Sequence, residues 1–255
     1  MRAHAPTVPV IGNLGAVQLN YGCDLDSCRE AVAMVGADAL ALHLNPLQEA
    51  LQPEGDVDFS DLLPKIGDVA AGLDVPVIAK EVGSGIAPST ARALRDHGVT
   101  WIDVAGLGGT SWARIEAARR EDVALGELFA GWGIPTPQAI RDLAALDGIA
   151  VIGSGGVRSG VDVAKALALG AELVGLAQPF LAPAIENADA VVEAIERLVR
   201  TLRIAMFCVG ARDLAALRQM PLVARAPWSP FDGAPVNAHT ISHPFSSTSQ
   251  PGTEP

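Results

Sequence analysis

The chain has 255 residues, of which 49% are hydrophobic and 18% are charged, and its formal net charge is −11. This length suits one α/β barrel, and the apolar content excludes a chain that is disordered throughout. The acidic balance argues against nucleic-acid binding and a basic membrane-surface protein, and no run of 18 apolar residues is present for a transmembrane helix.

Seven short apolar, β-branched segments alternate with helical patterns. The predicted strands are 8–11, 39–44, 75–79, 101–104, 128–131, 149–152 and 173–176. Near-continuous apolarity within each segment is typical of parallel strands that are buried on both faces. The predicted helices are 27–35, 89–97, 111–120, 136–146, 160–169, 187–205 and 211–219. Alternating βα units of this length predict a parallel sheet.

The last two predicted strands are followed by GSGGVRSG (153–160) and GLAQPF (175–180). These glycine-containing segments are typical of the phosphate-binding loops after strands 7 and 8 of a barrel. Seven strands leave one position empty, so we expect a TIM-type (β/α)8 barrel that lacks its N-terminal segment and first strand. A doubly wound sheet is the alternative, but its glycine-rich loops usually gather at one switch point, whereas here they follow most strands.

Residues 1–225 are predicted to form the barrel domain. Residues 226–255 are rich in Pro, Ser, Thr, Asn and His, and we expect them to be a disordered tail. The N-terminus has no apolar signal core, and the cysteines at 23, 28 and 208 have no metal-ligand spacing. We therefore expect a cytoplasmic protein with reduced thiols.

Polar side chains follow each apolar segment, where a barrel carries its active site. In the GSGGVRSG loop, Gly155 and Gly156 would let backbone N–H groups approach a phosphate, and Arg158 would add charge. The second loop would contribute Ala177 and Gln178. A plain glycine turn is the alternative interpretation.

Lys80 follows the apolar run VPVIA, so it would be partly desolvated and would hold negative charge on a cofactor or act as a Schiff-base amine. The alternative is a salt bridge to Glu81. Segment HLNPLQE (43–49) gathers four polar side chains, of which Glu49 is a plausible Mg²⁺ ligand. Segment GLGGTSW (106–112) places Thr110 near another anion, whereas Trp132 is expected in the core or behind the site.

Together these segments resemble the type 2, FMN-dependent isopentenyl-diphosphate isomerase family. The resemblance rests on GNLGAVQ, HLNPLQE, KEVGSGI, DVAGLGGTSW, GWGIPT and GSGGVRSGVDVAKALALGA, which occur in the expected order. It implies that the chain interconverts isopentenyl and dimethylallyl diphosphate, with FMN, Mg²⁺ and NADPH or a similar reductant. It also implies a homo-oligomer and a small-molecule diphosphate substrate.

The resemblance further assigns residue roles. FMN would be contacted by Asn13, Lys80 and Thr110, and its phosphate by Gly155, Gly156, Arg158, Ala177 and Gln178. The substrate would face His43, Asn45 and Gln48, and Glu49 would bind Mg²⁺.

Two alternatives remain. One is an FMN-dependent 2-hydroxy-acid oxidoreductase, which needs a histidine base on a late strand; after His97 the sequence has histidines only at 239 and 243. The other is a truncated or degenerate FMN-binding barrel, since the family's N-terminal Arg-Lys segment and Met-Thr-Gly-Gly strand are not found before Val8.

Overall fold

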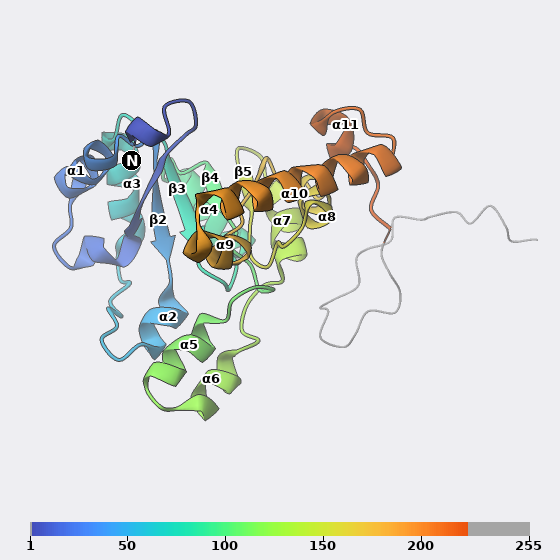
Figure 1. Cartoon of the computed structure of the whole chain (residues 1–255). Helices are drawn as coiled ribbons and strands as arrows, with labels where there is room; N and C mark the ends of the chain where they lie inside the picture. Colours follow the sequence, from blue (N-terminus) through green and yellow to red (C-terminus); the bar gives the residue numbers. More distant parts are fainter. Residues whose placement is uncertain (1, 224–255) are drawn as a thin grey trace, which may run out of the picture. The chain divides into compact units, whose positions relative to one another are not determined.

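The computed structural model describes residues 2–223, and residues 2–222 belong to one compact unit. Its centre is one parallel sheet of six strands (Figure 1). The strands are β1 (Ile11–Gly15), β2 (Ala39–Leu44), β3 (Val77–Glu81), β4 (Trp101–Asp103), β5 (Ala150–Gly153) and β6 (Leu173–Val174). The predicted tail, 226–255, lies outside the described residues.

Each strand pairs with the next strand in the sequence, in the order β1-β2-β3-β4-β5-β6. The chain therefore moves across the sheet in one direction. A doubly wound sheet reverses direction at a switch point, so this order excludes that alternative and is the order found in α/β barrels. Within the described residues the sheet is open, with β1 and β6 at its edges.

Helices connect successive strands. Between β1 and β4 lie η2 (Ala16–Asn20), α1 (Leu25–Val35), α2 (Pro46–Leu51), α3 (Leu62–Gly72) and α4 (Pro88–Asp96). Between β4 and β6 lie α5 (Trp112–Arg119), α6 (Val123–Phe129), α7 (Thr136–Ala144) and α8 (Gly160–Ala168). The chain begins with η1 (Arg2–His4), and β6 is followed by η3 (Gln178–Phe180), α9 (Leu181–Glu186), α10 (Ala188–Cys208) and α11 (Leu214–Arg218).

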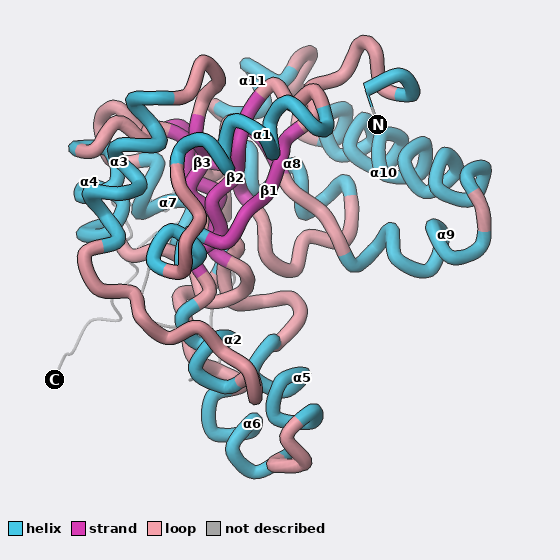
Figure 2. Tube along the Cα trace, turned by 90° about the vertical axis from the view of Figure 1, so that its left-hand side faces the viewer, coloured by secondary structure: helices cyan, strands magenta, loops and turns pink. Residues whose placement is uncertain are grey.

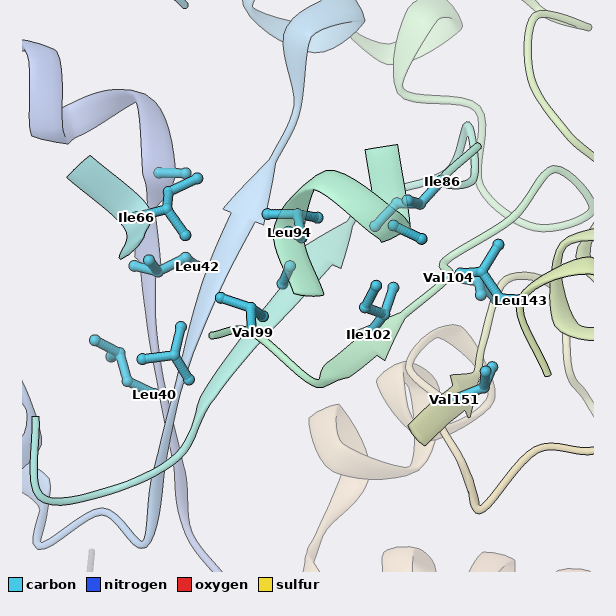
Figure 3. Packing of buried hydrophobic residues seen from close by; sticks show 14 of the residues in the cluster. Leu40, Leu42, Ile66, Ile86, Leu94, Val99, Ile102, Val104, Leu143 and Val151 are labelled. Carbon is cyan, nitrogen blue, oxygen red and sulfur yellow. The ribbon is translucent and has the colours of Figure 1, made fainter. Parts of the chain in front are cut away.

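The main core lies between one face of the sheet and helices α1, α3, α4 and α7 (Figure 3). Its strand residues include Leu40, Leu42, Ile102 and Val151, which alternate along their strands with residues of the opposite face. That opposite face holds only a small apolar cluster, formed by Ala41, Ile78 and Ile152 with Ala39 and Trp101 against it. In a closed barrel this face is the interior, and its upper end is where polar groups collect.

Three helices lie beyond the carboxyl ends of the strands. Figures 1 and 2 show α2, α5 and α6 grouped there, and contacts join α5 to both α2 and α6. These helices form one wall of the candidate site. None of the described helices combines the length and apolar character needed to span a membrane.

The strand predicted at 128–131 is wrong. Its first residues end α6, whose start is capped by the Asp122 carboxylate accepting from the Leu125 amide at 3.0 Å. Leu128 is 79% exposed, so this apolar run does not enter the sheet. A single parallel bridge, Leu107 with Pro135, is formed near that position, and β4 pairs directly with β5.

Other boundaries move by a few residues. β1 begins at Ile11, three residues after the predicted start, and β3 ends at Glu81, so Asn13 and Lys80 lie within strands. The reason is that the inner face of a barrel accepts polar side chains. A prediction based on apolar runs alone ends the strand before such residues. Helices α2, α3, α6 and α9 were not predicted, whereas the seven predicted helices are confirmed within a few residues.

Candidate active site

A row of side chains crosses the carboxyl end of the sheet. The parallel register pairs Gly15 with His43, His43 with Lys80, and Lys80 with Asp103. Paired residues of neighbouring parallel strands point to the same face, and strands lie about 4.8 Å apart. The structure therefore brings His43, Lys80 and Asp103 together on the inner face, as the barrel prediction requires.

The surroundings of His43 favour its neutral form. Burial lowers the pKa of its imidazole, and the positive charge of Lys80 lowers it further, against a smaller opposing effect of Glu49. The Nδ1 atom lies 3.3 Å from the Asn13 amide nitrogen. Because that nitrogen only donates, Nδ1 acts as the acceptor, which leaves Nε2 as the protonated donor.

Lys80 makes no salt bridge to Glu81, contrary to that alternative. Its Nζ donates to the main-chain oxygen of Glu81 at 2.9 Å. The Glu81 carboxylate instead accepts from the amides of Val82 and Gly83 at 2.7 and 2.6 Å and from that of Ser84.

Asp103 lies next to Lys80 in the register, and burial raises the pKa of its carboxyl. Asp103 accepts from Ser154 Oγ and from the Ala105 amide, so it ties β4 to the loop after β5.

Helix α2 presents a second polar group. Asn45 precedes its first turn and donates through Nδ2 to Glu49 Oε1 at 2.7 Å. Glu49 Oε2 accepts from the Asp56 amide at 2.8 Å and from the Gln52 side chain. Both Asn45 and Glu49 are buried, and Asn45 Oδ1 has no hydrogen-bond partner. A buried, unpartnered oxygen beside a carboxylate is a suitable position for a hard cation such as Mg²⁺.

Gln48 joins α2 to α5. Its Nε2 donates to Glu116 Oε1 at 2.9 Å, and its Oε1 lies 3.3 Å from Asn45 Nδ2. The other oxygen of Glu116 accepts from Arg119 Nη1 at 2.6 Å. This network fixes which end of the Gln48 amide faces α5.

A narrow pocket lies against this network. Its lining includes Gln48, Glu81, Thr110, Trp112 and Trp132. Trp132 is 63% exposed and contacts Phe129 edge-to-face, with ring centroids 6.0 Å apart, so its predicted place in the core is wrong. Thr110 lies in an exposed loop at the same pocket.

The glycine-rich loops after β4 and β5 pack closely. Gly155 and Gly156 have φ values of +102° and +79°, and a Cβ on either would lie 2.2 Å from the main-chain oxygen of Gly106 or Gly108, respectively. These glycines are therefore required by loop packing, a role the sequence analysis missed. Within residues 2–223, the amides of residues 155–157 have no acceptor, so they are available to a phosphate.

Arg158 stands beside these amides. Its guanidinium contacts main-chain oxygens of Gly156 and Gly108 at 3.3 and 3.5 Å and pairs with no carboxylate of the described chain. The start of α8 is not free for a phosphate, because Asp162 accepts the amides of Arg158 and Ser159 at 3.2 and 3.1 Å.

The loop after β6 lies against this region. A Cβ on Gly175 would come 2.9 Å from Ser154 Cβ. Ala177 and Gln178 follow as exposed residues at the start of η3. The loops after β4, β5 and β6 therefore meet, and each carries predicted phosphate-site residues or their packing partners.

The sequence analysis missed the part played by Glu116. It is only 2% exposed, although it lies on a helix of low amphipathicity between Ile115 and Ala117. No periodicity marks a buried carboxylate of this kind. Only the tertiary contact with Gln48, 68 residues away in sequence, reveals it.

Comparisons with known proteins agree with this geometry. The profile of a family described as FMN-dependent dehydrogenase matches residues 45–224. A protein of Stutzerimonas stutzeri (strain A1501) named isopentenyl-diphosphate delta-isomerase is 51% identical over 229 residues, covering 88% of this chain and 66% of the relative. A protein of the same name from Synechococcus sp. (strain ATCC 27144 / PCC 6301 / SAUG 1402/1) is 48% identical over 223 residues, covering 86% and 64%. The chain thus spans about two thirds of the length of these relatives.

Among solved structures, a mandelate oxidase variant in complex with 4-Br-2-hydroxy-methylphenylacetate superposes with a TM-score of 0.60 at 25% identity, covering 84% of this chain and 64% of that one. This likeness confirms the barrel-type α/β fold.

Proposed function

The chain belongs to the FMN-dependent dehydrogenase family, and from this premise we propose that it forms the FMN-binding barrel of an isopentenyl-diphosphate delta-isomerase. The reaction interconverts isopentenyl and dimethylallyl diphosphate. The observation that carries the proposal is the pair of cations, Lys80 and Arg158, which form no salt bridge in the described part of a chain with a net charge of −11. Free cations at the carboxyl end of such a sheet favour phosphate-bearing ligands.

The loop residues fit an FMN phosphate. The free amides of residues 155–157 and the Arg158 guanidinium would hold the phosphate, together with the backbone at Ala177 and Gln178. Asn13, Lys80 and Thr110 would contact the remainder of the cofactor. Arg158 contributes most of the charge here, because Asp162 already occupies two amides at the start of α8.

Asn45 and Glu49 would suit Mg²⁺, which would offset the negative charge of a diphosphate. Glu49 would supply a carboxylate oxygen and Asn45 its unpartnered Oδ1. No cluster of three or more acidic, histidine or cysteine ligands occurs among the described residues. That agrees with Mg²⁺, which is usually held by one or two carboxylates, water and substrate phosphates.

Reduced FMN would supply the acid–base group at the reacting carbons. The chain's own contribution is to position and to stabilise charge. Neutral His43 would donate from Nε2, the Gln48 amide would be oriented by Glu116, and Lys80 would offset negative charge. NADPH as the reductant and a homo-oligomeric assembly remain predictions.

The second candidate, oxidation of a 2-hydroxy acid, is supported by the fold of the mandelate oxidase alone. Its histidine base is expected on a late strand. In residues 2–223 the last histidine is His97, which ends α4 and contacts the Ala93 main-chain oxygen. The isomerase is therefore the better-supported function.

The proposal is tested by incubating the chain with FMN, Mg²⁺ and a reductant under anaerobic conditions. Isopentenyl diphosphate in D₂O should give dimethylallyl diphosphate, followed by proton NMR. A parallel sample with oxidised FMN and mandelate or lactate tests the second candidate through flavin bleaching. Bleaching without isomerisation would overturn the proposal in favour of the oxidoreductase, and neither signal despite FMN binding would indicate a degenerate barrel.

A further inference from the structure

Cys23 and Cys28 flank the first turn of α1. Asp24 is the N-cap residue, and its carboxylate accepts from the Ser27 amide at 2.9 Å, while the Asp24 amide lies 3.4 Å from Ser27 Oγ. In such a capped turn, the side chain before the cap often packs against that of the fourth helical residue. Those two positions are Cys23 and Cys28.

The backbone on both sides of the pair is fixed. The Cys23 amide donates to Gln18 O at 3.0 Å, and the Tyr21 amide donates to the same oxygen at 2.9 Å. The Cys28 amide donates to Asp24 O at 3.0 Å. Rotation of the two cysteine side chains is therefore the main motion that can change the distance between the two sulfur atoms.

The two thiols have different surroundings. Cys28 is fully buried in the main core, whereas Cys23 is half-buried at its margin. Burial raises the pKa of the Cys28 thiol to about 12, with a further contribution from the neighbouring Cys23 and a smaller one from Asp24. An external reagent therefore reaches Cys23 first, and Cys28 stays protonated at neutral pH.

We propose that Cys23 and Cys28 form a reversible disulfide site whose reaction partner is a low-molecular-weight disulfide. The Cys23 thiolate attacks one sulfur of that disulfide, which forms a mixed disulfide and releases one thiolate. Cys28 Sγ then loses its proton and attacks the Cys23 sulfur, which releases the second thiolate. Two protein thiols lose two protons and two electrons, and the external disulfide is reduced to two thiols.

Formation of the mixed disulfide makes Cys28 easier to deprotonate. Once Cys23 is in the mixed disulfide, it carries no charge, so its contribution to the raised pKa of Cys28 disappears. Burial and Asp24 still act on Cys28, so ring closure is the slower step.

The test is a titration of the folded full-length chain with mixtures of reduced and oxidised glutathione. Remaining thiols are alkylated after denaturation, and the adducts are counted by intact mass and located by peptide mapping. Reduced protein should show all three cysteines alkylated. In oxidised protein Cys23 and Cys28 should both lose their adducts and appear in one linked peptide, and dithiothreitol should restore both thiols.

Two variants complete the test. Cys208→Ser removes the exposed third cysteine and should leave the linked peptide unchanged. Cys23→Ser, at the half-buried position, should fold and should abolish the linked peptide, and the buried Cys28 should stay a free thiol. Retention of all three free thiols, a link that involves Cys208, or a glutathione adduct that stays on Cys23 without ring closure would overturn the proposal.

Discussion

Gln48 and Glu116 form a partly buried hydrogen bond between α2 and α5, with 2.9 Å between Gln48 Nε2 and Glu116 Oε1. The amide nitrogen of Gln48 is thereby committed to α5. In the proposed isomerase, Glu116 is a positioning residue that determines how Gln48 faces the substrate. This contact also ties the helices beyond the sheet to each other.

The bond predicts coupling between the two residues. Glu116→Ala should lower the free energy of unfolding by about 1–3 kcal/mol, because it leaves the Gln48 amide without its partner. Urea unfolding of both single variants and the double variant should give a coupling energy of roughly 0.5–3 kcal/mol. Glu127→Ala, at an exposed residue that pairs with Arg114, is the matched control. Additive effects of Gln48→Ala and Glu116→Ala would show that the bond is not formed in solution.

Glu49→Gln should reduce turnover by roughly 10–100-fold and weaken its dependence on Mg²⁺, since one charge-assisted contact is worth about 1.5–3 kcal/mol. FMN binding should be retained, because Glu49 lies on α2, away from the glycine-rich loops. A Mg²⁺ titration of isomerase activity measures this. Glu30→Gln, on the exposed side of α1, controls for net charge. An unaltered Mg²⁺ response would remove Glu49 from the metal site.

Arg158→Ala should weaken FMN binding by about 1.5–3 kcal/mol, or roughly 10–150-fold in Kd. The physical reason is loss of the unpaired guanidinium beside the free amides of residues 155–157. Quenching of FMN fluorescence on titration gives the Kd. Arg200→Ala, on exposed α10, removes the same charge elsewhere and should leave the Kd unchanged. Equal affinities of the Arg158 variant and wild type would make this loop a structural turn alone.

The sequence predicted the alternation of strands and helices well because parallel strands are uniformly apolar. Ile102 and Val151 are buried in the sheet as their patterns indicate. The same rule failed at Leu128, where an apolar run belongs to a short exposed helix. A run as short as 128–131 has too little periodicity to distinguish a strand from a helix.

The candidate site was predicted mainly through strand ends and motifs. His43 and Lys80 could be grouped because they lie at the carboxyl ends of neighbouring strands. Glu116 could not, since its role depends on a contact between helices that no local pattern encodes. The packing role of Gly155 likewise depends on the distant Gly106.

Titration of His43 should show its altered environment. Its pKa is lowered from 6.5, first by burial and then by Lys80. Lys80→Met should therefore raise the His43 pKa, whereas Lys65→Met, which removes a lysine bonded to Leu19 and Asn20, should not. Imidazole signals in NMR spectra, assigned with a His43→Gln variant, give the values. Equal shifts in both lysine variants would contradict the proximity of Lys80 to His43.

The lowered pKa of His43 also makes the free energy of unfolding depend on pH. Because the folded state depresses the pKa of His43, the unfolded chain binds more protons as the pH falls through 6.5. The stabilising contribution is present above that pH and is lost below it, with a slope of at most about 1.4 kcal/mol per pH unit. His43→Gln should flatten this part of the profile. Burial raises the pKa of Asp103, so its contribution has the opposite sign: the free energy of unfolding decreases as the pH rises above 3.8.

Gly155→Ala and Gly210→Ala separate loop packing from backbone strain. Both glycines have positive φ, +102° and +73°, so each substitution costs about 1–2 kcal/mol from backbone conformation alone. Nothing lies within 4 Å of a Cβ at Gly210, whereas at Gly155 the Cβ would lie 2.2 Å from Gly106 O. Gly155→Ala must therefore also force apart the loops after β4 and β5.

We expect urea unfolding to show a clearly larger loss for Gly155→Ala than for Gly210→Ala, and FMN affinity to fall only in the former. The second readout follows because the displaced loop carries the free amides of residues 155–157. Gly22→Ala, also at positive φ with open space around its Cβ, is a further control for strain. If all three variants lost the same free energy and kept FMN affinity, the close approach between Gly155 and Gly106 would not exist in solution.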